Sequence, residues 1–424
     1  MNDRPETGPT PDAGRLDSWK EIAAHLGRDV RTVQRWEKTD GLPVRRVPGG
    51  RSRSVFALTG ELDAWIVSRP KPRPRRWVLW AAAAAVIIAV AFTVLGRARA
   101  RGPLTTVVAR GGTLVGLDDR QRDLWSVAVP ESGRAALASD VAVMLTDLDG
   151  DGERDAIARV RLQGDHATGI GDVLYSITES GKVRWSRRLD DRLVFRSGAY
   201  ESPWVIRDMV MMERGPSKRI ALAAHHSVWW PGIIATLDGD GRTLHRFVNS
   251  GWITQLELTR DGRFLLGAGV NNAHDSAALV VLDPDAASGT SPEEAGSPFE
   301  CLNCPIGTPH RYFLLPRSEL NRVAGTALLK QTVDILDDGA ILLRIPQDPA
   351  SGAEALYEFS PDLELRRASL ADVYWDWHRR LEAQKLVDHP AERCPERRGL
   401  DVTSWERARG WRTWTIPWSA NAPR

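Results

Sequence analysis

Cysteine is scarce in this chain of 424 residues, which contains only three copies. Three thiols are too few to hold together a disulfide-built fold. Cys301 and Cys304 form one CxxC pair, but Pro305 stands where haem attachment would need a histidine, and no second pair exists for a zinc ribbon. We expect a local disulfide between Cys301 and Cys304, and the sequence leaves the state of Cys394 open.

Signatures of catalysis are also missing. The chain has no nucleophile elbow, no paired-histidine metal motif and no glycine-rich phosphate loop. Long helical periodicity is almost absent beyond residue 103, where short apolar runs alternate with Asp/Gly turns. We therefore predict that the protein is not an enzyme and that residues 104–424 are all-β.

One long apolar run is present. Residues 77–95, WVLWAAAAAVIIAVAFTVL, contain no charge, no glycine and no proline. As a helix they would extend roughly 28 Å, close to the thickness of a bilayer's hydrocarbon core. The run predicts a single transmembrane helix over residues 77–96. Basic residues are more frequent before it than after it, which favours a cytoplasmic N-terminus.

The charge of the chain is unevenly divided. Residues 1–76 carry 16 Lys/Arg against 10 Asp/Glu, although the whole chain has a net charge of only +2. A small basic module suggests a polyanionic partner. At its ends, residues 1–14 have the Pro/Gly/Asp composition of a disordered tail, and residues 69–76 (RPKPRPRR) form a stiff basic linker.

Between these ends, residues 15–68 show the start and stop signals of helices. Ser18 or Asp17 can cap a first helix, with Glu21 as its capping-box partner. Gly27 ends that helix, and a second one follows Asp29. Two short helices around a glycine-containing turn predict a helix-turn-helix.

A hairpin and a third helix complete this module. Residues 44–47 and 54–58 read as strands joined by a Pro-Gly-Gly turn that is rich in arginine, and residues 60–68 read as a short helix.

The run SWKEIAAHLGRDVRTVQRWEKTDGLPVRRVPGG, followed by ELDAWI, resembles winged-helix DNA-binding domains of the MerR/excisionase type. In that family the second helix enters the major groove and the wing touches the flanking backbone. The alternative is that the module docks a protein. The residues nominated for DNA contact are Arg28, Arg31, Thr32, Gln34, Arg35, Arg46, Arg51 and Arg53.

A hairpin pattern repeats in the all-β region. Three strand-turn-strand units end at Trp125, Trp185 and His245, sixty residues apart. Such a period predicts a β-propeller of around six to eight blades, with β-sandwich domains as the alternative. The units resemble quinoprotein-like and FG-GAP/VCBS propellers at the hairpin level. We expect the tryptophan-rich C-terminal segment to close the last blade or to cover its core, and the alternative is an exposed aromatic face.

The sharpest local motif is an acidic loop that begins at residue 147. Its carboxylates stand at positions 1, 3, 5 and 9, with glycine at position 6, a pattern that lets hard oxygen ligands converge on Ca²⁺. The loop resembles the DxDGDGxxD loop of FG-GAP/VCBS blades, and the alternative is a plain Asp/Gly turn. The nominated calcium ligands are Asp147, Asp149, Asp151 and Asp155.

The domain order predicts a membrane-tethered one-component transcription regulator. A cytoplasmic DNA-binding module, one span of the inner membrane and a periplasmic sensor of an unknown ligand or protein would follow one another along the chain. Paired DNA half-sites favour a homodimer. The alternative is a membrane-anchored binding or scaffold protein whose N-terminal module docks a protein.

Overall fold

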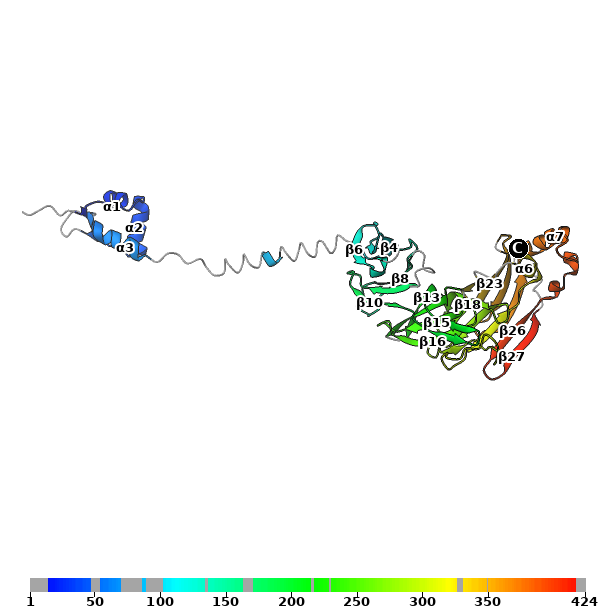
Figure 1. Cartoon of the computed structure of the whole chain (residues 1–424). Coiled ribbons are helices and arrows are strands. Elements are labelled where there is room, and N and C mark those ends of the chain that lie inside the picture. Colours follow the sequence, from blue (N-terminus) through cyan, green and yellow to red (C-terminus); the bar gives the residue numbers. More distant parts are fainter. Residues whose placement is uncertain are drawn as a thin grey trace, which may run out of the picture. The chain divides into compact units, whose positions relative to one another are not determined.

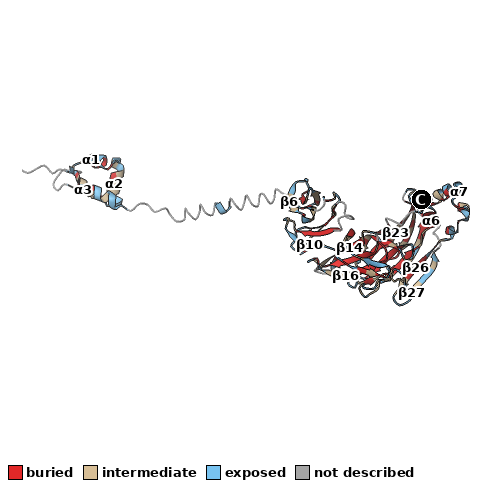
Figure 2. Cartoon of the chain, viewed as in Figure 1, coloured by how far each residue is buried: buried red, intermediate tan, exposed pale blue. Residues whose placement is uncertain are grey.

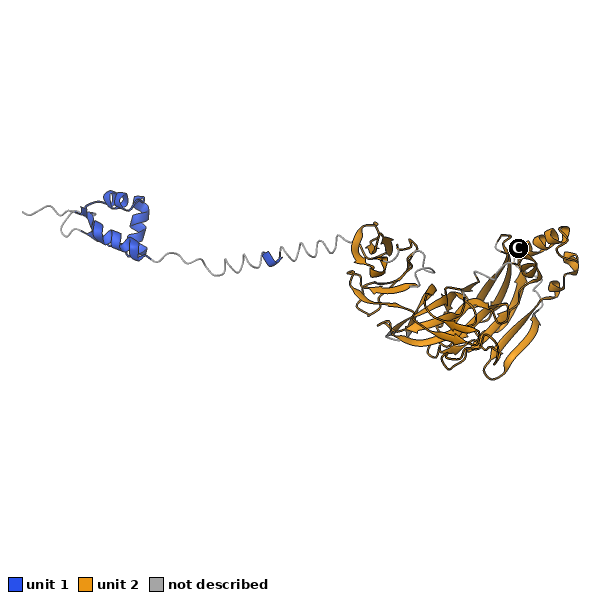
Figure 3. Cartoon of the chain, viewed as in Figure 1, with its two compact units in different colours: residues 1–97 blue, residues 98–424 orange. Residues whose placement is uncertain are grey.

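The chain divides into two compact units, residues 1–97 and residues 98–424 (Figure 3). Each is described by itself below. The computed structural model describes residues 14–46, 54–69, 86–88, 102–133, 136–162, 171–214, 217–228, 230–325, 331–348 and 350–416.

The predicted transmembrane helix falls almost wholly outside the described residues. Only residues 86–88 of it are described, and these are helical. In the described parts of the chain, none of the helices has the length and apolar character needed to cross a membrane. The span inferred from residues 77–95 stays a prediction, as do the tail and the linker on either side of the first unit.

The first unit contains three helices and a small antiparallel sheet, in the order along the chain that the sequence predicts (Figure 1). Strand β3 lies in the middle of the sheet, between β1 and β2. The elements are β1 (Arg15–Leu16), α1 (Trp19–His25), α2 (Val30–Thr39), β2 (Arg45–Arg46), β3 (Val55–Leu58) and α3 (Thr59–Ser68).

Side-chain caps explain where the first two helices begin. Ser18, rather than Asp17, caps α1, because its hydroxyl accepts the backbone N–H of Glu21 at 3.2 Å. Asp29 caps α2 by accepting the backbone N–H of Thr32 at 2.9 Å. Each cap satisfies a backbone donor that the first turn of a helix leaves without a partner.

A small apolar core holds these elements together. Helix α2 contributes the buried Val33 to it, and the partly buried Val30 and Trp36 pack against it, which leaves the opposite side of α2 for other contacts. The buried members of this core are Ile22, Ala23, Leu26, Val33, Leu42, Val55, Ala57 and Leu62.

The second unit is built from five antiparallel sheets that follow one another along the chain (Figure 1). We number them in chain order. Sheet 1 contains β4 (Thr106–Arg110), β5 (Thr113–Leu117) and β6 (Asp123–Ala128); sheet 2 contains β7 (Ala142–Thr146), β8 (Asp155–Val160), β9 (Val173–Ile177) and β10 (Val183–Arg188). Sheet 3 contains β13 (Trp204–Arg214), β14 (Ser217–His226), β15 (Gly232–Leu237), β16 (Thr243–Asn249) and the short parallel β20 (Gly289–Thr290).

Sheets 4 and 5 complete the series. Sheet 4 contains β17 (Ile253–Leu258), β18 (Leu265–Asn271), β19 (Ser276–Leu282), β21 (Arg311–Leu315), β26 (Leu400–Glu406) and β27 (Gly410–Ile416). Sheet 5 contains β22 (Thr332–Ile335), β23 (Ile341–Asp348), β24 (Ala353–Phe359) and β25 (Leu365–Leu370). A separate hairpin, β11 (Leu193–Phe195) with β12 (Gly198–Tyr200), lies between sheets 2 and 3 in the chain.

The sheets stack because their strands are apolar on both faces. On β14 of sheet 3, Ile220 and Leu222 belong to the core shared with sheet 2, whereas Ala221 and Ala223 belong to the core shared with sheet 4. This alternation is the two-residue period of a strand. All four side chains are at most 1% exposed, and Figure 2 shows the buried strands in the middle of the unit.

Four apolar cores join the five sheets in sequence. They lie between sheets 1 and 2, 2 and 3, 3 and 4, and 4 and 5. Among the described residues, none of these cores joins sheet 5 to sheet 1. A stack of up-and-down sheets is propeller-like and differs from the paired sheets of a sandwich, but its five sheets are fewer than the predicted six to eight blades.

The C-terminal segment accounts for part of this difference. Strands β26 and β27 add to the edge of sheet 4 beside β21 and make no blade of their own. Trp405 and Trp411 pack on the core between sheets 3 and 4, and Trp414 packs on the core between sheets 4 and 5. The segment does not close the last blade, because its strands pair with sheet 4. Its described tryptophans do pack on apolar cores, as the expectation that they cover a core predicts.

The sixty-residue repeat has a packing function. Trp125 of sheet 1 lies against Gly181 in the outer hairpin turn of sheet 2, and Trp185 of sheet 2 lies against Gly241 in that of sheet 3. Both glycines have positive φ, +87° and +77°. A Cβ atom would lie 2.6 Å from the Trp125 side chain or 2.8 Å from the Trp185 side chain, so only glycine leaves room for the indole.

We predict that Gly241→Ala lowers the free energy of unfolding by about 2–4 kcal/mol, because it adds both a left-handed alanine and a clash with Trp185. Gly352→Ala is the matched control, since Gly352 has a φ of +72° with nothing within 4 Å of the added methyl group. Denaturant unfolding of the two variants measures the difference. Equal destabilisation of the two would contradict the packing role.

Candidate functional site

One face of helix α2 carries a row of cations. Arg31, Arg35 and Lys38 follow each other at intervals of four and three residues, which places them along one side of the helix, and Arg28 lies just before the N-cap residue Asp29. All four are exposed, and none forms an ion pair with a described residue. We call these four residues the α2 stripe.

The other arginines of the first unit that the structure describes each have a nearby carboxylate. Arg45 pairs with Glu61 at 2.7 Å, and Arg46 pairs with Glu37 at 3.2 Å. Arg46 was nominated for DNA contact, but its guanidinium already has a carboxylate partner. Among the described arginines of the first unit, the three without a carboxylate partner therefore all belong to the α2 stripe.

The remaining nominated residues differ in their surroundings. The hydroxyl of Thr32 donates to the Asp29 carboxylate at 2.7 Å, so its donor is committed to the helix cap. The side-chain and backbone hydrogen bonds from Thr32 lower the pKa of Asp29. Gln34 is half-buried, and Arg51 and Arg53 lie outside the described residues.

An aromatic contact fixes the far end of α2. The rings of Trp36 and Trp65 lie 5.6 Å apart and tie α2 to α3, and the Trp65 indole N–H donates to the carbonyl of Asp40 at 3.1 Å. Arg69 lies over both rings, 4.5 Å from Trp36 and 5.0 Å from Trp65. Sequence reasoning placed Arg69 in the linker, whereas it belongs to this contact.

The acidic loop of sheet 2 gathers three of its four predicted calcium ligands. One carboxylate oxygen from each of Asp147, Asp149 and Asp151 lies within 4.8 Å of the others. Asp155 is not in this group, because it is buried at the start of β8 and accepts the backbone N–H of Leu148 at 3.0 Å. The structure thus brings together three of the four predicted ligands, and the calcium site itself stays a prediction.

A cation from the protein itself lies between the loop and Asp155. The Arg184 guanidinium is 2.5 Å from Asp149 and 3.3 Å from Asp155. Its hydrogen bond lowers the pKa of Asp149, whereas burial raises the pKa of Asp155 in spite of Arg184. Sequence reasoning missed Arg184 because it lies 29 residues beyond Asp155 in the chain.

We predict that Arg184→Met lowers the free energy of unfolding by about 1–3 kcal/mol at neutral pH, because Asp155 would stay buried without its cation. The destabilisation should shrink as pH falls through the pKa of Asp155, since a protonated carboxyl needs no counter-ion. Denaturant unfolding at several pH values measures both effects. Arg154→Met, at an exposed position of the same loop, is the control and should leave the free energy of unfolding unchanged. If Arg184→Met destabilised the protein equally at every pH, the result would argue against the ion pair.

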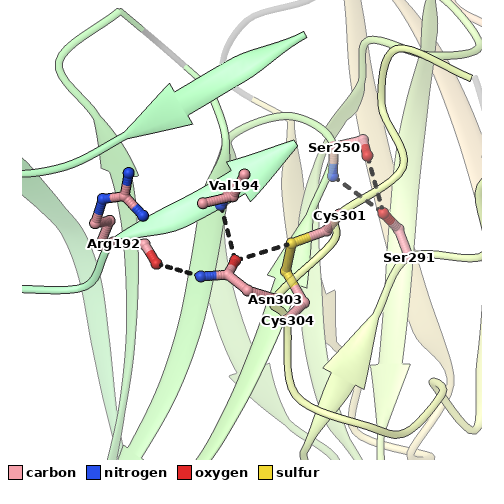
Figure 4. The surroundings of a disulfide bond; sticks show 7 residues. All are labelled: Arg192, Val194, Ser250, Ser291, Cys301, Asn303 and Cys304. Carbon is pink, nitrogen blue, oxygen red and sulfur yellow. Dashed lines mark hydrogen bonds between the residues drawn. A yellow bond between two sulfur atoms is a disulfide. The ribbon is translucent and has the colours of Figure 1, made fainter. Parts of the chain in front are cut away.

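Cys301 and Cys304 form a disulfide, with their Cα atoms 5.7 Å apart (Figure 4). Asn303, which lies between them, bonds to the backbone beside and within β11. Its side-chain oxygen accepts the N–H of Val194 at 2.8 Å, and its NH₂ group donates to the carbonyl of Arg192 at 2.9 Å. The disulfide thus closes a short loop that is held against the β11–β12 hairpin.

Comparisons with known proteins give only remote likenesses. No protein-family model matches the chain, and no curated protein matches it. Similar solved structures include a eukaryotic initiation factor (9% identity, TM-score 0.34, covering 61% of this chain and 48% of that one). A second is the hydrazine synthase of Kuenenia stuttgartiensis (12% identity, TM-score 0.35, covering 61% of this chain and 59% of that one). A third is the C-terminal domain of Pseudomonas aeruginosa PilY1 (11% identity, TM-score 0.35, covering 61% of this chain and 57% of that one).

This chain spans less than two thirds of each of these three proteins. TM-scores and sequence identities this low support no inference about an activity or a ligand of this chain. The propeller-like description therefore depends on the stacked sheets and their shared cores.

Proposed function

We propose that the protein is a membrane-tethered one-component transcription regulator. The first unit would bind DNA as a winged helix-turn-helix in the cytoplasm, residues 77–95 would cross the inner membrane, and the second unit would sense a ligand or partner in the periplasm. The observation that carries the proposal is the α2 stripe, whose cations have no described counter-ion while neighbouring arginines have one.

The chemistry of the stripe suits a nucleic acid. Guanidinium groups bind phosphate oxygens, and they also bind the O6 and N7 atoms of guanine in the major groove. The apolar side of α2 faces the core of the first unit, and the exposed Arg31, Arg35 and Lys38 on its other side are available to a groove. The hairpin of β2 and β3 follows α2 in the chain, in the position that a wing takes in the family that the sequence resembles.

Other features support the proposed orientation and assembly. A DNA-binding unit must be cytoplasmic, and the excess of basic residues before the apolar run favours the same orientation. A disulfide in the second unit suits an oxidising compartment. Paired half-sites on DNA would require a homodimer. The proposal assigns no catalytic activity to either unit.

The alternative proposal is a membrane-anchored scaffold whose first unit docks a protein. A protein partner would also be attracted to exposed cations, but through carboxylates. The two proposals differ in whether the α2 stripe selects DNA sequences, so one binding experiment separates them.

We predict that residues 1–70 bind selected genomic DNA fragments and that Arg31→Ala/Arg35→Ala weakens this binding by tenfold or more, since a specific contact is worth about 1–3 kcal/mol. The slope of log affinity against log salt should also decrease by about 2, because each of the two substitutions removes one cation from the phosphate backbone. Fluorescence anisotropy with fragments from upstream of the protein's own gene, over a range of salt concentrations, measures both quantities.

Arg45→Ala is the control, because it removes one charge from an arginine that Glu61 already neutralises. Equal and weak binding by the wild-type unit and the double variant would refute the regulator and leave the scaffold. Weak binding that responds to the double variant without sequence selection would also count against sequence-specific regulation.

We also propose that the loop at residues 147–151 binds Ca²⁺ through its three gathered carboxylates. Millimolar Ca²⁺ should then raise the midpoint of thermal unfolding of the full chain by about 1–4 °C. Asp147→Asn/Asp151→Asn should abolish the rise, whereas Asp240→Asn, in a two-carboxylate turn of sheet 3, should keep it. If Ca²⁺ left the midpoint of thermal unfolding of the wild-type chain unchanged, the loop would be a plain Asp/Gly turn that binds no calcium.

A further inference from the structure

Four residues near the C-terminus bring different metal-binding groups to one point. Glu319 is the first residue of α6 (Glu319–Ala324), and His378 lies on α7 (Asp372–Ala383). His389 follows α7, and Cys394 stands between two short 3₁₀ turns, η2 (Ala391–Arg393) and η3 (Pro395–Arg398). One ligand atom from each of the four lies within 4.8 Å of all the others.

Three of the six distances between these ligand atoms match the edges of a tetrahedron around zinc. His378 Nε2 lies 3.4 Å from His389 Nε2, which lies 3.2 Å from Glu319 Oε2. Cys394 Sγ lies 3.6 Å from the same Glu319 oxygen. Ordinary zinc bond lengths and tetrahedral angles give about 3.4 Å for nitrogen to nitrogen, about 3.4 Å for nitrogen to oxygen and about 3.6 Å for sulfur to oxygen.

The hydrogen bonds around His389 leave its lone pair directed at the cluster. The Nδ1 atom of His389 lies 2.9 Å from the Asp388 carboxylate, and since a carboxylate only accepts, Nδ1 donates there in the neutral ring. Nε2 is then an acceptor that faces a Glu319 oxygen and the Nε2 of His378. A carboxylate that orients a histidine in this way is the usual support of a zinc-bound imidazole.

Burial makes this convergence costly without a cation. His378 is 0% exposed and Cys394 is 2% exposed. The Nδ1 atom of His378 has no hydrogen-bond partner among the described residues, and the only partner of its Nε2 atom among them is the Nε2 atom of His389. A divalent cation would bind the converging lone pairs and compensate for their removal from water.

We propose that Glu319, His378, His389 and Cys394 bind one Zn²⁺ ion as a structural site. Two imidazoles, one thiolate and one carboxylate complete a four-coordinate shell and leave no position for a substrate. The ion would tie α6 and α7 to the turns that lead into β26. It would thereby fix the path by which the C-terminal strands return to sheet 4.

The test uses the full chain, stripped of metal with a chelator and titrated with Co²⁺. Cobalt bound by a thiolate in a tetrahedral site gives intense visible bands and a sulfur-to-cobalt charge-transfer band. We expect both to saturate at about one cobalt per chain and to disappear when Zn²⁺ is added. Cys394→Ser should lose the charge-transfer band, whereas Cys301→Ser/Cys304→Ser should keep it.

His389→Gln provides a second variant that retains the thiol, and it should bind Co²⁺ at least tenfold more weakly. Circular dichroism of each variant shows whether it is folded. For the wild-type chain, Zn²⁺ should raise the unfolding midpoint of the stripped protein. A wild-type chain without the charge-transfer band, or a band that persists in folded Cys394→Ser, would overturn the proposal.

Discussion

The structure of the second unit depends on one constraint: each inner sheet must cover both of its apolar faces with neighbouring sheets. Strand β14 shows this in five successive residues, which alternate between the core shared with sheet 2 and the core shared with sheet 4. A single such sheet would expose one apolar face to water, so the sheets form a stack. The contacts of Trp125 with Gly181 and of Trp185 with Gly241 hold the outer hairpins of neighbouring sheets in register.

The ion pairs, the disulfide and the proposed metal ligands of the second unit lie in its loops and at the edges of its sheets. Arg184 neutralises Asp149 and Asp155 at the acidic loop, and the disulfide closes a loop against the β11–β12 hairpin. Three of the four proposed zinc ligands lie in the connection from sheet 5 to the strands that return to sheet 4, and Glu319 lies between β21 and β22. In each case the strands supply a fixed support, and the charged or sulfur-containing groups lie at strand ends or in the segments that connect strands.

In the first unit, signals within a few residues of each other in the sequence predict the helices but not the contacts between them. Capping residues and apolar spacing predicted α1 and α2 almost to the residue, because a helix start depends on side chains within one turn of it. The pairing of Arg46 with Glu37 and the position of Arg69 over Trp36 and Trp65 could not be predicted in this way. Those contacts join residues that only the folded chain brings together, and they decide which arginines remain free.

By itself, the sequence determined the elements with short-range causes: the helices of the first unit, the mostly β character of the second, its repeating hairpins and its CxxC pair. The helices α6 and α7 depart from the all-β expectation for the second unit. Tertiary structure alone decided the number of sheets, the addition of β26 and β27 to sheet 4, the separation of Asp155 from the other loop carboxylates, and the meeting of Glu319 with Cys394. The physical reason is the distance along the chain between the residues that interact. Caps, turns and alternation act over a few residues, whereas strand pairing and ligand convergence depend on packing between segments that lie tens of residues apart.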